Sequence, residues 1–148
     1  MQDLMDWPPI WLLVALALTA LLDWLLPWGL FGDFGVGAGS ALIVMGVALM
    51  LAAVWQMRAA RTTIIPRRDP AALVTGGVFR LSRNPIYLGD ALVLAGVILW
   101  RDVPLAAPLV PLFLAVIQGR FIMGEEARLR AAFGRGFDDW AQRVRRWI

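Results

Sequence analysis

The chain of 148 residues contains no cysteine and no histidine, and all 14 of its basic residues are arginine. Without cysteine there is no disulfide, no iron–sulfur cluster and no thiol nucleophile. Without histidine, zinc, haem and acid–base sites lose the residue on which they most often depend. We therefore predict no metal site.

Charge is absent from long stretches of the chain. Apolar residues make up 60% of the sequence, above the roughly one half that is usual in globular domains. A helix needs about 20 apolar residues, with a range of roughly 17 to 25, to cross a bilayer. Four runs approach that length, and the third is short: 10–28, 39–57, 86–100 and 103–122. We predict a single all-α membrane domain, 1–148, with four transmembrane helices and a helical tail at 123–148.

The loops between these runs differ in charge. Six arginines and one acid lie between the second and third runs. Arg120 lies at the end of the fourth run, and six more arginines and four acids follow it, whereas the opposite loops hold only Asp33, Arg101 and Asp102. The positive-inside rule then places the long loop, the tail and both termini in the cytoplasm. Because the arginines flank apolar runs, anionic lipid headgroups explain them more simply than nucleic acid does. Residues 1–6 carry two acids and no base, so we expect no signal peptide and a first run that stays in the protein.

Small residues predict where the first three spans turn and pack. Glycines between residues 29 and 39 predict an interfacial loop between the first two spans. Alanines four residues apart, Ala48 with Ala52 and Ala91 with Ala95, are typical of closely packed membrane helices.

The last third of the chain contains a proline-interrupted span and an amphipathic tail. Pro108 and Pro111 predict a bend, either as an ordinary feature of membrane helices or to open a cavity toward the cytoplasm. Gly134 and Gly136 separate a helix that begins near Glu125 from the tail helix. Apolar residues in the tail recur at helical spacing, so we expect that helix to lie in the headgroup zone: Phe133, Phe137, Trp140, Val144 and Trp147.

Residues 73–87 form a polar segment with several glycines between apolar runs. Irregular backbone of this kind cannot face lipid, so the segment lines a water-accessible cavity or lies at the headgroup surface. Asp90, one turn into the next span, is either structural, reaching Arg83 or headgroup water, or part of a site. Glu125 and Glu126 are either an acidic helix start or, with Arg120, a charged cluster over a cavity.

Four motifs in order resemble the membrane methyltransferases of the isoprenylcysteine carboxyl methyltransferase and phospholipid N-methyltransferase group. They are Leu73-Val74-Thr75-x-Gly77-Val78-Phe79, Arg83-x-Pro85-x-Tyr87, Glu125-Glu126 and Phe133-Gly134. The resemblance covers about residues 66–148, and the first two spans match only in being hydrophobic. It implies S-adenosylmethionine as the methyl donor, with S-adenosylhomocysteine as product, and a cofactor-site loop at 66–87 on the cytoplasmic side.

The resemblance also implies which residues form the site. The candidate catalytic residues are Arg120, Asn84 and Glu125. The candidates for substrate contact are Arg120, Asp90 and Arg83. The residues expected to contact the cofactor are Ala71, Ala72, Leu73, Val74, Phe79, Asn84, Pro85, Ile86, Tyr87, Glu125 and Glu126.

The chain departs from the prenylcysteine members at two positions. Those members have histidine at the position of Asn84 and tyrosine at that of Phe79. Asparagine cannot act as a base near neutral pH. The Arg83-Asn84-Pro85 sequence is typical of bacterial members, which argues against a prenylcysteine substrate and implies the bacterial inner membrane.

Methyl transfer from a sulfonium is an in-line displacement, so orientation and electrostatics supply most of the rate. We expect a lipophilic or amphiphilic acceptor whose tail enters from the bilayer. A carboxylate acceptor needs no base, whereas an amine loses a proton, which solvent, Glu126 or Asp90 could take. The acceptor atom (oxygen, nitrogen or sulfur) and the oligomeric state stay open.

Two other functions stay open. An enzyme like the sterol reductases would use NADPH and hold its 2′-phosphate with arginines. A non-enzymatic membrane module would use the glutamates as helix caps and the arginines only to set topology. Binding of S-adenosylhomocysteine, of NADPH or of neither separates the three functions.

Overall fold

The computed structural model describes residues 6–63 and 70–148, and those residues contain helices and no strand. Residues 66–69 of the predicted cofactor-site loop lie outside them. The all-α prediction is confirmed. The elements are α1 (Pro8–Leu25), α2 (Gly32–Ala59), η2 (Gly77–Arg80), α3 (Pro85–Trp100), η3 (Pro104–Ala106), α4 (Leu109–Ile117), η4 (Gln118–Ile122), α5 (Met123–Phe133) and α6 (Arg135–Arg143).

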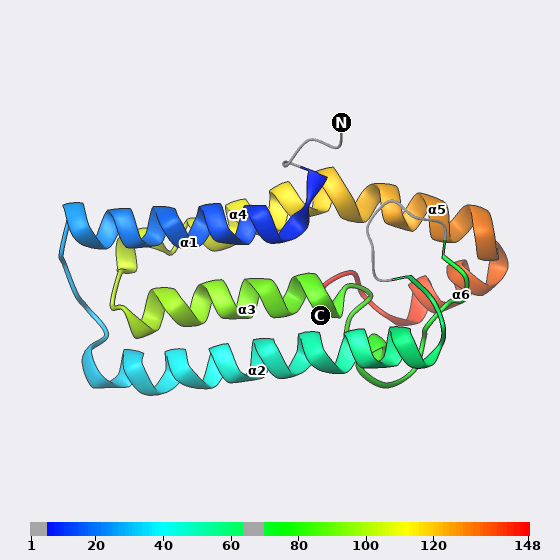
Figure 1. Ribbon diagram of the computed structural model, residues 1–148, viewed down its shortest axis with the longest axis horizontal. Coiled ribbons are helices and arrows are strands. Elements are labelled where there is room, and N and C mark those ends of the chain that lie inside the picture. The colour runs from blue at the N-terminus through cyan, green and yellow to red at the C-terminus, as the bar shows by residue number, and fades with distance from the viewer. Residues whose placement is uncertain (1–5, 64–69) are drawn as a thin grey trace.

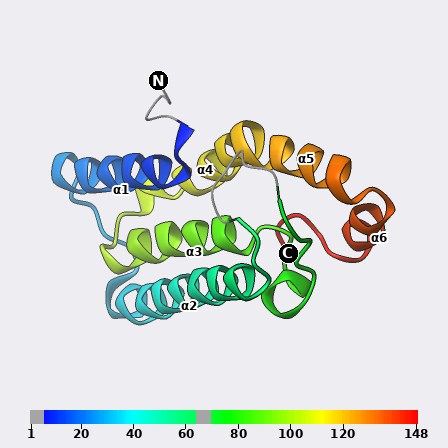
Figure 2. The same cartoon turned by 45° about the vertical axis from the view of Figure 1, so that its right-hand side comes forward.

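The helices form an elongated bundle with α3 between α1 and α2 (Figures 1 and 2). α4 packs with α1 and α3, and α5 continues beyond them to α6 at one end of the molecule. One apolar core lies among α1, α3 and the α4 region. A second core joins the end of α2, the segment around Phe79, and helices α5 and α6.

Three helical stretches are long and apolar enough to cross a membrane: Pro8–Leu25, Gly32–Ala59 and Pro104–Phe133. The fourth predicted span, α3, has 16 residues. At ~1.5 Å per residue it is about 24 Å long, less than the ~30 Å of a hydrocarbon core. Of the four predicted spans, three are therefore long enough to cross a membrane, and the fourth, α3, is a shorter apolar helix.

The predicted glycine loop at 29–39 is wrong in its extent, because α2 already begins at Gly32. Gly35 and Gly39 face α3 from within the helix, as does Gly46 further along α2. A β-carbon at Gly39 would lie 2.5 Å from the carbonyl oxygen of Gly96, and one at Gly46 would lie 2.6 Å from that of Gly89. Glycine thus lets α2 and α3 approach closely. The alanines predicted to pack α2 on its neighbour do not form that face, because Ala48 is exposed.

The two prolines of the predicted bend lie at the start of the last apolar span. Pro108 caps α4 and Pro111 lies in its first turn, where backbone N–H groups have no intrahelical partner and proline costs little. The 3-10 helix η3 and a turn at 107–108 precede α4, and from Leu109 the chain stays helical to Phe133. Its irregular turn is the π-helical η4, directly before α5. Glu125 and Glu126 therefore lie inside a continuous helical run and do not start a free helix.

The tail helix packs its apolar face on protein. Gly134, with φ +51°, ends α5 and turns the chain into α6, whereas Gly136 lies within α6. Phe137 is fully buried and Trp140 nearly so, against Ala53 of α2 and Phe79. The sequence periodicity identified the apolar face of this helix. It did not identify the protein surface that covers that face.

Candidate functional site

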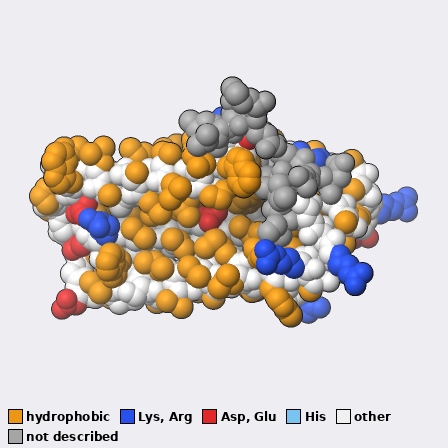
Figure 3. Space-filling view, in the orientation of Figure 1, with side chains coloured by type: hydrophobic (Ala, Val, Ile, Leu, Met, Phe, Trp, Pro, Cys, Tyr) orange, Lys and Arg blue, Asp and Glu red, His pale blue; other side chains and the backbone are white. Residues whose placement is uncertain are grey.

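A cavity of about 430 Å³ lies where the end of α2, the start of α3 and α5 meet. This volume falls within the roughly 300–1,000 Å³ typical of small-molecule sites. Figure 3 shows a mostly apolar surface along the bundle, with blue arginine side chains gathered at the end that carries α5 and α6. The cavity belongs to that arginine-rich end.

Six parts of the chain supply the cavity walls. The first turns of α3 and the segment before it form one side, and α5 and α6 form another. α2 and the start of α1 add apolar and aromatic side chains. The described lining consists of Trp7, Pro8, Pro9, Met50, Val54, Met57, Thr62, Thr63, Pro70, Ala72, Leu73, Val74, Phe79, Arg83, Asn84, Pro85, Ile86, Tyr87, Asp90, Glu125, Arg128, Leu129 and Trp140.

One hydrogen bond spans the cavity wall from α3 to α5. The Tyr87 hydroxyl donates to Oε1 of Glu125 over 2.7 Å. Tyr87 is 7% exposed, and its ring lies 6.4 Å from that of Phe121. A charge-assisted hydrogen bond of this length fixes the orientation of the carboxylate. Glu125 is thus held at the cavity by a residue 38 positions earlier in the chain.

Asp90 is the second carboxylate of the cavity and is 7% exposed. It follows Tyr87 by three residues, so the two side chains share one face of α3. Among residues 6–63 and 70–148, the structure records no hydrogen bond or ion pair to Asp90, including none to Arg83. A buried ionised carboxylate without a partner is costly. The side chain therefore favours a ligand that brings a cation or a hydrogen-bond donor.

Arg83 lines the same cavity with an incompletely satisfied guanidinium. Its Nη2 lies 3.3 Å from Oε1 of Glu126. Its buried Nε has no hydrogen-bond partner within the described part of the chain. Burial lowers the pKa of Arg83 below its ordinary value, and the charge of Glu126 opposes that shift. Arg83 thus brings a guanidinium group to the cavity wall, with its Nε closed to solvent.

Asn84 stands at the turn into α3, and Pro85 begins the helix. Its side-chain Nδ2 donates to the carbonyl oxygen of Arg146 over 3.0 Å, and its backbone N–H donates to Oγ of Ser82 over 3.0 Å. Asn84 is 9% exposed. Although it lines the cavity, its amide nitrogen is engaged with the chain itself.

Most of the residues predicted to contact the cofactor meet at this cavity. Those present are Ala72, Leu73, Val74, Phe79, Asn84, Pro85, Ile86, Tyr87 and Glu125, together with the substrate candidates Arg83 and Asp90. Their roles stay predictions.

Three predicted residues are not in the described lining. The backbone N–H of Ala71 donates to Oγ1 of Thr62 over 3.1 Å. The Arg120 guanidinium lies 5.2 Å from the ring centroid of Trp11 on α1. Glu126 pairs with Arg83 and Arg146 and is not among the described lining residues. Arg120 therefore stays a candidate that the cavity geometry does not support.

Sequence reasoning missed several residues of the cavity. Arg128 and Leu129 follow Glu125 by three and four positions, so helical spacing could have found them. Met50 and Val54 of α2 are apolar residues in an apolar helix and carry no such signal.

A family model described as phospholipid methyltransferase matches residues 34–136. A search of curated proteins and a search of solved structures found no match. The matched range includes α2, which the sequence motifs did not reach, and every cavity-lining residue from Met50 to Leu129. It spans more than two thirds of the 148 residues. The chain belongs to the phospholipid methyltransferase family.

Proposed function

We propose that this protein transfers a methyl group from S-adenosylmethionine to a lipophilic or amphiphilic acceptor at the cytoplasmic face of a membrane. The observation that carries the proposal is the cavity itself. Two carboxylates, two guanidinium groups and aromatic side chains converge there from separate elements of a chain in a methyltransferase family. The family supports methyl transfer to a lipid-like molecule, and the donor and the face of the membrane are our proposal.

The cavity residues fit the chemical groups of the proposed donor. When bound, S-adenosylmethionine supplies an electrophilic methyl group on a cationic sulfur. Asp90, buried and without a recorded partner in the described chain, and Glu125 offer negative charge to a cationic ligand. Arg83 and Arg128 line the cavity and offer guanidinium donors to a carboxylate. The residues present therefore fit a ligand that carries both charges.

Such a site accelerates the reaction mainly by orienting the donor and the acceptor, because effective molarity and fixed electrostatics account for most of the rate of a displacement reaction. Tyr87 holds Glu125 in one orientation through its 2.7 Å hydrogen bond. Met50 and Val54 form an apolar wall on the α2 side that excludes water and suits a hydrocarbon chain. We therefore place the donor toward α5 and the acceptor toward α2.

The distribution of arginine supports a cytoplasmic site. Arg58 and Arg61 end α2, and Arg83 and Arg128 line the cavity at the same end of the bundle. Segments rich in arginine stay on the cytoplasmic side of membranes. Soluble nucleotide-containing donors are made in that compartment. We accordingly propose an inner-membrane protein of bacterial type whose cavity opens near the cytoplasmic headgroups.

Titration of the protein, purified in detergent, with S-adenosylhomocysteine tests the proposal by calorimetry. The parent is expected to bind in the micromolar range. Glu125→Gln removes the charge at the cavity and keeps the size of the side chain. It is expected to weaken binding by roughly tenfold to a hundredfold, because a hydrogen bond to a charged group contributes about 1.5–3 kcal/mol.

The matched control is Asp139→Asn, the same chemical change at an exposed position of α6 outside the described cavity lining. It should bind like the parent. A parent that prefers NADPH would support a reductase, and a parent that binds neither ligand would support a non-enzymatic module. Either result contradicts the proposal.

A further inference from the structure

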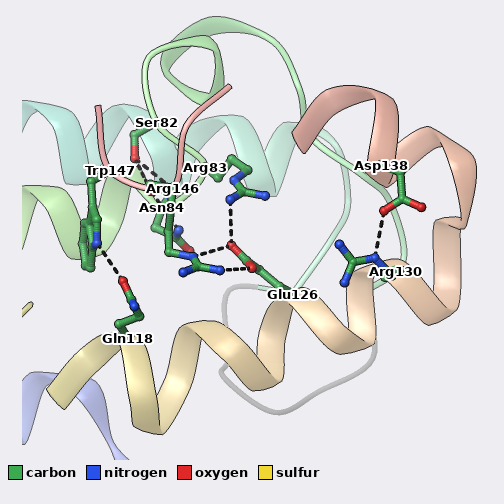
Figure 4. A network of polar contacts seen from close by, with 9 residues as sticks. All are labelled: Ser82, Arg83, Asn84, Gln118, Glu126, Arg130, Asp138, Arg146 and Trp147. Atoms are coloured by element: carbon green, nitrogen blue, oxygen red, sulfur yellow. Dashed lines mark hydrogen bonds and ion pairs between the residues drawn. The ribbon is translucent and has the colours of Figure 1, made fainter. Parts of the chain in front are cut away.

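Residues 144–147, here called the strap, run between the turn before α3 and the long helical run. Three hydrogen bonds join the strap to the turn. The Arg83 N–H donates to the carbonyl oxygen of Arg145 over 3.0 Å. The Ser82 hydroxyl and the Asn84 side chain both donate to the carbonyl oxygen of Arg146, over 3.1 and 3.0 Å. Figure 4 shows Ser82 and Asn84 beside Arg146 from close by.

The other side of the strap is joined to the helical run. Trp147 donates its ring N–H to Oε1 of Gln118 in η4 over 3.1 Å. Arg146 makes a two-point contact with Glu126 of α5, Nε to Oε1 over 3.0 Å and Nη2 to Oε2 over 2.7 Å. The strap therefore connects the two walls of the cavity that carry Asn84 and Glu125.

Glu126 is the centre of this connection. Both of its carboxylate oxygens contact guanidinium groups, because Arg83 adds an ion pair at 3.3 Å to the two contacts from Arg146. The Glu126 side chain is 12% exposed. Its hydrogen bond raises the pKa of Arg146 above the ordinary value. Two-point arginine–carboxylate contacts are strong and directional, so this pair sets the distance between strap and α5.

Glu125 and Glu126 are adjacent on a helix and point about 100° apart. Glu125 faces Tyr87 and the cavity, whereas Glu126 faces the strap. A shift of α5 relative to the turn would move both Glu125 and Asn84. Displacements on the order of 1 Å in a site cost up to about a hundredfold in rate.

We infer that Glu126 is a positioning residue, which holds the strap between α5 and the turn at Ser82–Asn84 and so fixes the cavity walls. It acts through Arg146 and does not itself bind the methyl donor. The inference rests on the proposed function only for the identity of the ligand. The strap contacts stand independently of that ligand.

The test compares Glu126→Gln with Arg145→Gln. Both variants remove one charge, but the Arg145 side chain is exposed and belongs to the same strap. Hydrogen exchange is measured by mass spectrometry on peptides that cover 82–87 and 144–147, and S-adenosylhomocysteine affinity is measured by calorimetry. Local opening raises exchange where few contacts remain. We expect at least about tenfold faster exchange in both peptides and about tenfold weaker affinity in Glu126→Gln, with Arg145→Gln like the parent.

Parent-like exchange at 82–87 in Glu126→Gln would overturn the inference. So would faster exchange with unchanged affinity, because a merely structural residue lowers the unfolding temperature without altering the site of the folded protein. If Glu126→Gln does not fold, Arg146→Lys takes its place, since lysine keeps the charge but cannot make the two-point contact. A parent without affinity for S-adenosylhomocysteine contradicts the proposed function, and exchange rates alone then decide the role of Glu126.

Discussion

A carboxylate far from the cavity shows how a single side chain organises a loop. Asp102, just after α3, accepts backbone hydrogen bonds from Leu30, Phe31 and Gly32 over 2.7, 2.7 and 3.0 Å. These N–H groups lie at the start of α2, where the helix itself offers no acceptor. The three bonds lower the pKa of Asp102 below its ordinary value. One residue thus joins the end of α3 to the beginning of α2.

The lowered pKa gives this contact a defined pH dependence. A carboxyl group whose pKa is depressed by folding stabilises the protein above its unfolded pKa of about 4. That stabilisation is lost as the pH falls through the lower folded pKa. Asp102→Asn should therefore reduce the thermal unfolding temperature at pH 7, and the difference from the parent should shrink below about pH 4.

Thermal unfolding in an acid-tolerant detergent, followed by circular dichroism between neutral and acidic pH, measures this difference. Asparagine is the appropriate replacement because Asp102 has φ +57°, a conformation that asparagine tolerates. A difference of equal size at neutral and acidic pH would show that Asp102 acts through packing and not through its charge.

Individual residues of the candidate site differ in how well sequence reveals them. Tyr87, Asp90 and Glu125 are polar groups beside or within apolar runs, and such positions attract attention because burial of polar groups is costly. Val54 gives no comparable signal, since nothing in a hydrophobic helix distinguishes a lipid-facing residue from a cavity wall. Arg120 was selected by its approximate position, whereas its contact with Trp11 depends on where α1 packs.

At the scale of elements, the antiparallel pair α2–α3 forms the frame for the cavity. The approach is closest at glycines on both helices: a β-carbon at Gly96 would lie 2.7 Å from the carbonyl oxygen of Gly39, and one at Gly89 would lie 2.7 Å from that of Gly46. Close backbone contact replaces the hydrophobic driving force that lipid removes. The position of Tyr87 and Asp90 thus depends on this pairing.

Gly39→Ala and Gly37→Ala separate packing from helix propensity. A β-carbon at Gly39 would lie 2.5 Å from backbone atoms of α3, whereas one at Gly37 has nothing within 4 Å. We expect Gly39→Ala to destabilise by about 1–3 kcal/mol through overpacking. Gly37→Ala should be neutral or stabilise by up to about 1 kcal/mol, because alanine has the higher helix propensity.

Reversible unfolding of both variants in mixed micelles gives the two free energies. Equal effects would mean that α2 and α3 are not in backbone contact, contrary to the packing described above.

Element boundaries were the weakest part of the sequence prediction, for a physical reason. Glycine serves both as a helix terminator and as a surface for close helix packing, and the sequence around Gly35 and Gly39 does not distinguish these uses. The distinction depends on α3, some 50 residues later. Gly134 was correctly predicted as a break. The chain also stays helical through the π-helical turn Gln118–Ile122 into α5, where the sequence suggested a helix that begins near Glu125.

At the scale of the whole molecule, the two ends of the bundle carry different chemistry. At one end, Asp102 accepts hydrogen bonds from the start of α2, and Arg101 contacts α1, with its Nε 2.9 Å from Oδ2 of Asp23. The other end contains the cavity, the strap and most of the arginines. Composition alone predicted a helical membrane protein. It did not predict that α6 packs on protein, because an amphipathic helix has the same sequence pattern whether lipid or protein covers it.

The central claim is that this arginine-rich end transfers methyl groups to a membrane amphiphile. The most direct measurement incubates the protein in vesicles of bacterial membrane lipid with methyl-labelled S-adenosylmethionine and follows label in the extracted lipid. We expect time-dependent labelling by the parent and by Asp139→Asn, and at least about tenfold slower labelling by Glu125→Gln. Lipid that stays unlabelled, or labelling that Glu125→Gln leaves unchanged, would contradict the account.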